Sequence, residues 1–140
     1  MVGENQRATE KLWVGNGVEI KSWHPSDSDF LIFHFQDHFS TTAAEKACEI
    51  WTDFHEKNAS SLIHIWDCTS MKSFDMAAKN VWMGKMKDHK DYIERIILIS
   101  DSIFIRGAAR LMSKFSKHPL AVYKSIEEVG EKENLQIPVY

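Results

Sequence analysis

The sequence is poor in cysteine and has no long apolar run. Only two of its 140 residues are cysteines, Cys48 and Cys68. They lack the spacing of metal ligands and are too few for a disulfide framework, and we expect both thiols to stay reduced in the cytosol. The apolar runs fall well short of the about 18–20 residues that a transmembrane helix needs. The sequence therefore predicts no membrane span.

Positive charge is not in excess either. Lys and Arg number 17 against 20 Asp and Glu, so the net charge is −3. A chain with this balance has no overall positive field that would attract nucleic acid. Residues 1–11 are polar and charged and lack the apolar core of a signal peptide. We expect a cytoplasmic protein that binds no nucleic acid.

The sequence does have the profile of one globular domain. Hydrophobic residues make up 44% of the chain and charged residues 26%. A chain of this length buries roughly two-thirds of the surface that it exposes when unfolded, so its core needs neither a disulfide nor a metal. We find no internal repeat. The expected organisation is a flexible N-terminal tail over residues 1–12, a single domain over 13–135 and a C-terminal tail over 136–140.

Strand and helix patterns alternate along the chain. Residues 18–23 and 30–35 predict an antiparallel hairpin, after a turn at residues 15–17. Helical spacing of apolar residues, together with capping signals, predicts helices over about 41–58, 73–92 and 103–117, and a short one after Ser125. Apolar runs predict parallel strands over 62–66, 95–100 and 121–124. This order indicates an α/β fold, with a mostly parallel sheet of about five strands, an N-terminal hairpin and about four covering helices.

The segment from Asp67 to Ala78 resembles the strand-to-helix junction of STAS domains. That junction typically reads Asp-Leu-Ser, a few residues, then Asp-Ser-Ser-Gly, and Asp67 and Asp75 match its two aspartates. Residues 97–110 and 122–128 are similar to the later part of the SpoIIAA-like, or STAS-like, subgroup. The fold of that subgroup is similar to the CRAL-TRIO lipid-transfer domain. The resemblance covers residues 18–130 and implies a STAS-like fold.

One departure from the STAS pattern concerns phosphorylation. In anti-sigma-factor antagonists, a serine just after the second aspartate is phosphorylated by a partner kinase. Met76 and Ala77 occupy those positions here, and Ala78 stands where glycine would be. Neither Met nor Ala has a hydroxyl group that could accept a phosphate. The resemblance therefore does not extend to the phosphorylation switch.

Catalytic and metal sites have weak support in the sequence. On an extended segment His34 and His38 share one face, but we interpret the seven histidines as scattered hydrogen-bonded residues and expect no metal site. Cys68, Ser70 and Ser102 follow predicted strands, where α/β proteins bind ligands, yet no GxSxG motif is present. We expect no catalytic site and no cofactor.

The third predicted helix carries a basic stripe and a separate apolar side. The stripe consists of residues three or four apart: Arg106, Arg110, Lys114 and Lys117. The apolar side consists of Phe104, Ala108, Leu111 and Phe115. Such a helix suits an anionic membrane or an acidic partner, and the alternative interpretation of the stripe is a solvated outer face. We expect the side opposite the stripe to pack on the sheet.

Taken together, these features predict a non-enzymatic binding or interaction module of the SpoIIAA-like type. The alternative is a carrier or sensor of a lipid or other small apolar or anionic ligand, which the abundant Trp, Phe and Met favour. A second alternative is a small enzyme using Cys68 or the histidines. Protein partners, peripheral membrane contact and a homodimer are left open. The candidate residues for binding a ligand or partner are Asp67, Thr69, Asp75, Asp101, Ser102, Arg106, Arg110 and Lys114.

Overall fold

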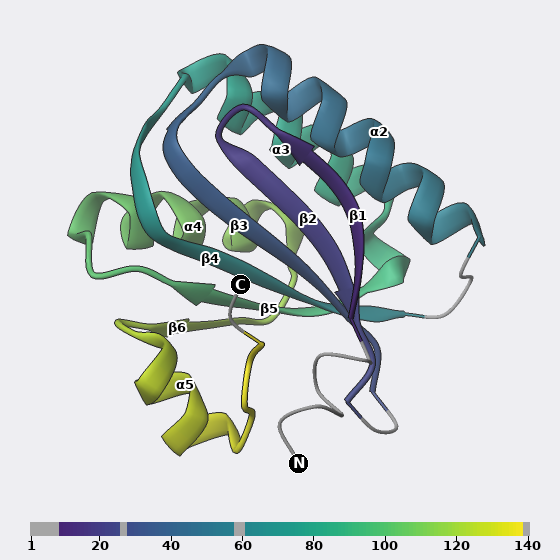
Figure 1. The fold of residues 1–140 in the computed structure, drawn as a ribbon. Coiled ribbons are helices and arrows are strands. Elements are labelled where there is room, and N and C mark those ends of the chain that lie inside the picture. Colours follow the sequence, from purple (N-terminus) through teal and green to yellow (C-terminus); the bar gives the residue numbers. More distant parts are fainter. Residues whose placement is uncertain (1–8, 26–27, 58–60, 139–140) are drawn as a thin grey trace.

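A six-stranded sheet runs through the computed structural model, which describes residues 9–25, 28–57 and 61–138 (Figure 1). Its strands lie side by side in chain order. The first three pair antiparallel, and the third to the sixth pair parallel. The strands are β1 (Thr9–Gly15), β2 (Val18–Trp23), β3 (Phe30–Phe39), β4 (Leu62–Phe74), β5 (Ile93–Ile99) and β6 (Leu120–Tyr123).

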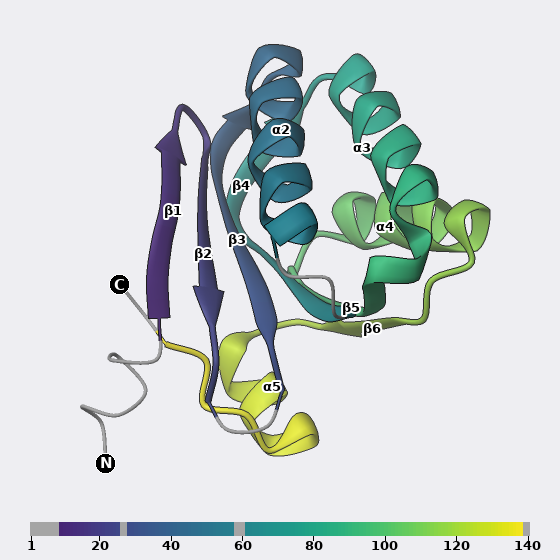
Figure 2. The same cartoon turned by 90° about the vertical axis from the view of Figure 1, so that its right-hand side faces the viewer.

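Three helices cover one face of the sheet (Figure 2). They are α2 (Thr41–Lys57), α3 (Met76–Asp88) and α4 (Ile103–Ser116), and each joins two neighbouring parallel strands. Because parallel crossovers are right-handed and all three move along the sheet in the same direction, their helices lie on the same face. The fourth helix, α5 (Ile126–Glu133), packs against the opposite face through Val129.

Serine residues mark where three helices begin. The Ser40 hydroxyl accepts a hydrogen bond from the Ala43 backbone N–H at 3.1 Å, before α2. Ser102 does the same for α4 and Ser125 for α5. Each hydroxyl satisfies a backbone donor that the first helical turn leaves without a partner. These starts agree with the capping signals in the sequence.

The main core is aromatic and lies between the sheet and α2, α3 and α4. The Trp51 and Trp82 rings meet edge to face with centroids 4.6 Å apart, and Phe33 contacts both rings. Edge-to-face contacts add to the free energy that these large side chains gain by burial. A smaller core on the opposite face includes Ile97 and Ile99 of β5. Both side chains are fully buried, which agrees with the predicted parallel strand over residues 95–100.

The expected tail boundaries are wrong. Residues 9–12 belong to β1, which pairs with β2 from Thr9 opposite Trp23, so the sheet has six strands instead of about five. The charged residues on this edge strand hide its pairing in the sequence. At the other end, Ile137 is buried in the smaller core. The rest of the expected N-terminal tail (residues 1–8), the expected end of the first helix (58) and the end of the expected C-terminal tail (139–140) lie outside the described residues. The division into a single domain stays a prediction.

Strands β3 and β4 are both longer than predicted. They continue past the expected ends at residues 35 and 66 and remain paired as far as Phe39 opposite Phe74. Two register shifts interrupt this extension, and Asp37 adopts a positive φ of 52° beside one of them. The shifts break the alternation of apolar and polar side chains, which is the sequence signal for a strand. The predicted strand-to-helix junction is therefore mostly strand. The second predicted helix also ends earlier, at Asp88, before a 3₁₀ turn at Lys90–Tyr92.

Substitution of a buried isoleucine tests the packing of β5 in the smaller core. We expect Ile97→Ala to lower the free energy of unfolding by about 2–5 kcal/mol, because the fully buried side chain would leave a cavity. Ile103→Ala is the matched control, since the Ile103 side chain is 81% exposed. Urea unfolding followed by circular dichroism measures both variants. Similar losses in the two would contradict the burial of Ile97 in this core.

Candidate functional site

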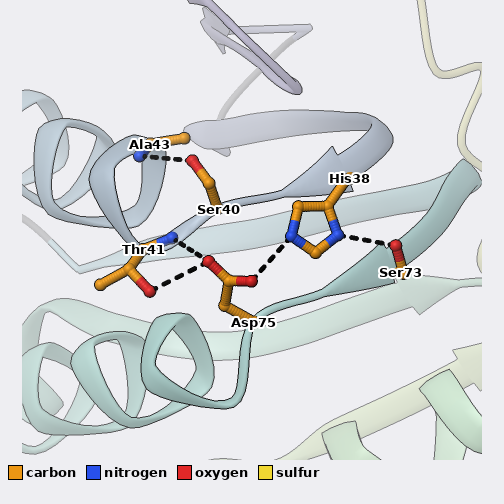
Figure 3. Close-up of polar contacts among 6 residues, drawn as sticks. All are labelled: His38, Ser40, Thr41, Ala43, Ser73 and Asp75. Carbon is orange, nitrogen blue, oxygen red and sulfur yellow. Dashed lines mark hydrogen bonds and ion pairs between the residues drawn. The ribbon is translucent and has the colours of Figure 1, made fainter.

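Asp75 joins three elements at the end of the extended β3–β4 pair (Figure 3). One carboxylate oxygen accepts a hydrogen bond from His38 Nε2 at 2.8 Å. The other accepts from the Thr41 backbone N–H at 2.9 Å and from its hydroxyl at 3.2 Å. Asp75 precedes α3, yet its side chain makes no capping bond there and instead satisfies the first turn of α2. The bond from the Thr41 N–H, followed by that from His38, lowers the pKa of the Asp75 carboxyl.

Ser73, His38 and Asp75 form a hydrogen-bonded series. Because the Asp75 carboxylate accepts the Nε2 proton of His38, Nδ1 of the neutral ring is left to accept the Ser73 hydroxyl at 2.7 Å. This order matches the nucleophile, base and orienting acid of hydrolases. However, about half of the His38 and Asp75 side-chain surface is exposed. The dry environment that strengthens such charges in active sites is therefore missing.

Asp67 lies in a separate, buried position on β4, and the exposed Thr69 follows it two residues later. The Asp67 carboxylate accepts hydrogen bonds from His34 Nδ1 at 2.9 Å and from the Thr69 hydroxyl at 2.7 Å. Burial by itself would raise the pKa of Asp67, but the bonds from His34 and Thr69 outweigh it and lower the pKa. Only 2% of Asp67 is exposed. The bond between His34 of β3 and Asp67 of β4 therefore links the two strands through buried side chains.

The other predicted residues follow β5. Ser102 caps α4 through the Ile105 N–H at 3.3 Å, whereas the neighbouring Asp101 is exposed. Arg106 donates from Nε to the Ser102 carbonyl at 3.4 Å, and Arg110 and Lys114 are exposed. The structure therefore separates the eight candidates into three groups, at Asp67, at Asp75 and along α4. Sequence reasoning missed the contacts of His38 and Thr41 with Asp75, because the register shifts hide which side chains meet.

The side of α4 that packs on the sheet differs from the expected one. Its buried residues are Ile105, Ala109, Met112, Ser113 and Ser116. The expected apolar side is largely exposed, by 69% at Phe104, 49% at Leu111 and 57% at Phe115. With 100° between successive helix residues, these side chains lie between the buried side and the basic stripe. We call Phe104, Leu111 and Phe115 the apolar strip.

An apolar cavity of about 60 Å³ lies between α3, α4 and the sheet. Met71, Phe74 and Lys79 line it and are partly exposed, so the cavity reaches the surface beside them. Phe104 of the apolar strip stacks on Phe74 with ring centroids 5.6 Å apart, next to this opening. The remaining lining residues include Phe35, Phe39, Trp66, Cys68, Trp82, Leu98, Ile105 and Met112.

Three histidines stack at the opposite end of α2. The ring centroid of His55 lies 5.5 Å from that of His64 and 6.0 Å from that of His89, and the ring planes are nearly parallel. Burial lowers the pKa of His64 well below its ordinary value and that of His55 to about 4. Nε2 of His55 lies 3.3 Å from Nε2 of His64, within hydrogen-bonding distance. Within residues 9–25, 28–57 and 61–138, no group of three or more His, Cys, Asp or Glu side chains could hold a metal ion.

Comparison with known proteins identifies the architecture. No family model and no curated protein matches the sequence. An uncharacterised DUF3478-family protein with a SpoIIAA-like fold, from Shewanella loihica PV-4, superposes with a TM-score of 0.68 at 13% identity, covering 82% of this chain and 92% of that one. The unphosphorylated anti-sigma factor antagonist SpoIIAA gives a TM-score of 0.58 at 14% identity, covering 91% and 97%. The chain has a SpoIIAA-like fold. The fold that the sequence resemblance implied is therefore confirmed, and at these identities the comparison carries the fold alone.

We expect this SpoIIAA-like domain not to be switched by phosphorylation at the segment between Asp67 and Ala78. Met76 and Ala77 open α3 without a hydroxyl, and the nearby Ser73 hydroxyl is bound to His38. Intact-mass and peptide mass spectrometry of protein from its native cells should find no stoichiometric phosphate in this segment. Stoichiometric phosphate at Ser70 or Ser73, accompanied by loss of partner binding, would contradict the prediction.

The stacked histidines predict a loss of stability in acid. His55 has a folded pKa of about 4 against an ordinary value of 6.5, so the unfolded chain binds its proton more readily between these values. The free energy of unfolding should therefore fall as the pH drops through this window, by about 3 kcal/mol from His55. Urea unfolding at several pH values should give a steeper slope for wild type than for His55→Phe. Parallel slopes for the two proteins would show that His55 is not the titrating group.

Proposed function

We propose that the protein is a non-enzymatic binding module whose binding surface is the exposed side of α4. The observation that carries this proposal is the apolar strip, in which three large apolar side chains share one side of α4 and are 49–69% exposed. Contiguous exposed apolar side chains of this kind are typical of interaction sites. The SpoIIAA structure that shares the fold is that of an anti-sigma factor antagonist, which supports a role in protein interaction.

The nucleophiles of the chain support a non-enzymatic role. The Cys68 thiol is buried, and burial raises its pKa, so it stays protonated at neutral pH and is a poor nucleophile. Ser73 has a histidine partner, but in an exposed setting that does not stabilise developing charge.

A fluorophosphonate probe should therefore leave Ser73 unlabelled. Labelling that His38→Gln abolishes would favour an enzyme instead.

A second candidate function is the transport or sensing of a small apolar ligand. The cavity between α3 and α4 favours it, because its lining is almost wholly apolar and it reaches the surface beside Phe74. Its volume of about 60 Å³ is far below the roughly 300–1,000 Å³ of typical ligand pockets. A larger ligand would need α4 to move away from the sheet. Native mass spectrometry distinguishes the two, since a co-purifying small molecule supports the carrier and an unliganded mass supports the binding module.

Site-specific cross-linking tests the proposed surface. We expect a photoreactive amino acid at position 111, in cells that naturally make the protein, to form a cross-link with a defined species, whether protein or lipid. Position 14 is the matched control, because Val14 is 59% exposed but lies on β1 at the far edge of the sheet. Cross-links from position 14 and none from position 111 would overturn the assignment of the α4 surface.

A further inference from the structure

Charge is unevenly distributed over the SpoIIAA-like domain. Helices α3 and α4 together contain six basic residues and one acidic residue: Lys79, Lys85, Lys87, Arg106, Arg110, Lys114 and Asp88. The net charge of these helices is +5, and since the whole chain carries −3, the remainder carries −8. The two helices that border the cavity are thus a positive region on an otherwise negative protein.

The apolar strip lies between basic residues on both of its sides. On one side runs the stripe that Arg106, Arg110 and Lys114 form along α4. On the other side is α3, from which Lys87 places Nζ 5.9 Å from the ring centroid of Phe115. The apolar strip therefore lies between the basic stripe and Lys87. No acidic residue lies between positions 103 and 117 to neutralise them.

The outermost cations of this surface are not neutralised within the domain. Among the residues that the structure describes, neither Arg110 nor Lys114 of α4 forms an ion pair. Acidic residues elsewhere in the chain could have neutralised the stripe, but none of the described ion pairs involves α4. A partner that covers α4 must therefore supply both apolar contact and negative charge.

We propose that the α4 surface docks on an anionic lipid bilayer, with the apolar strip inserted among the head groups and the flanking cations bound to their phosphates and carboxylates. This proposal rests on the proposed function, because it names the partner of the same surface. Exposed apolar side chains flanked by cations are typical of interfacial helices, whose long basic side chains reach the head groups while apolar ones enter the membrane.

Co-sedimentation with vesicles tests the proposal. We expect the wild-type protein to sediment at low salt with vesicles of phosphatidylcholine and phosphatidylserine, but weakly with phosphatidylcholine alone, and to be released at high salt. Arg110→Ala combined with Lys114→Ala should weaken binding about 25-fold, since each cation near the surface contributes about fivefold. Leu111→Ser and Phe115→Ser should each weaken it about tenfold through loss of apolar insertion.

Matched controls come from the opposite face of the sheet. Lys124→Ala with Lys132→Ala removes the same charge near α5, where both residues are exposed, and should leave sedimentation almost unchanged. Circular dichroism checks that every variant remains folded. Equal binding to neutral and anionic vesicles, equal loss in the α4 and α5 variants, or wild type that stays in the supernatant at low salt would overturn the membrane proposal. A protein cross-linked to position 111 together with no vesicle binding would overturn it while leaving the proposed binding surface intact.

Discussion

The direction of the parallel crossovers determines how this molecule presents its surfaces. From β3 onward, each helix returns the chain to the next strand along the sheet, so α2, α3 and α4 lie in a row on one face. The middle helix has neighbours on both sides, whereas α4 lies at the end of the row. Its outer side therefore has no further described helix to pack against. The basic stripe occupies this free side, and the apolar strip lies between the stripe and α3.

The extended pairing of β3 with β4 forms both the mouth of the cavity and the polar contacts of Asp75. The two strands project past the rest of the sheet and place Met71 and Phe74 beside α3 and α4, which forms the mouth of the cavity. The same extension brings His38 next to Ser73 and Asp75. Asp75 then ties the start of α2 to the end of β4, so the geometry near the mouth depends on one exposed carboxylate. The apolar cavity and the polar series are two results of the same irregular strand pair.

Binding and chemistry have different requirements, and the structure meets those of binding better. A reactive thiol or serine needs a site that excludes water and stabilises developing charge. The Cys68 thiol is buried but stays protonated, and Ser73 is hydrogen-bonded to a histidine but lies in a solvent-exposed setting. A binding surface needs exposed apolar area and unpaired charge, and α4 has both. No described helix is long and apolar enough to span a bilayer.

Local patterns in the sequence were sufficient to predict most helices and strands. The run from Ile96 to Ile99 is apolar at every position because both faces of β5 are buried, and Ser102 and Ser125 act on backbone donors three residues away. The candidate residues Arg110 and Lys114 were likewise visible, since helical spacing alone places them on one side. Interactions that join distant segments were not predictable in this way. The contact of Asp75 with Thr41 depends on two register shifts between β3 and β4. Helix α4 has two apolar sides, and only packing against the sheet decides that the side with Ile105 and Met112 is buried.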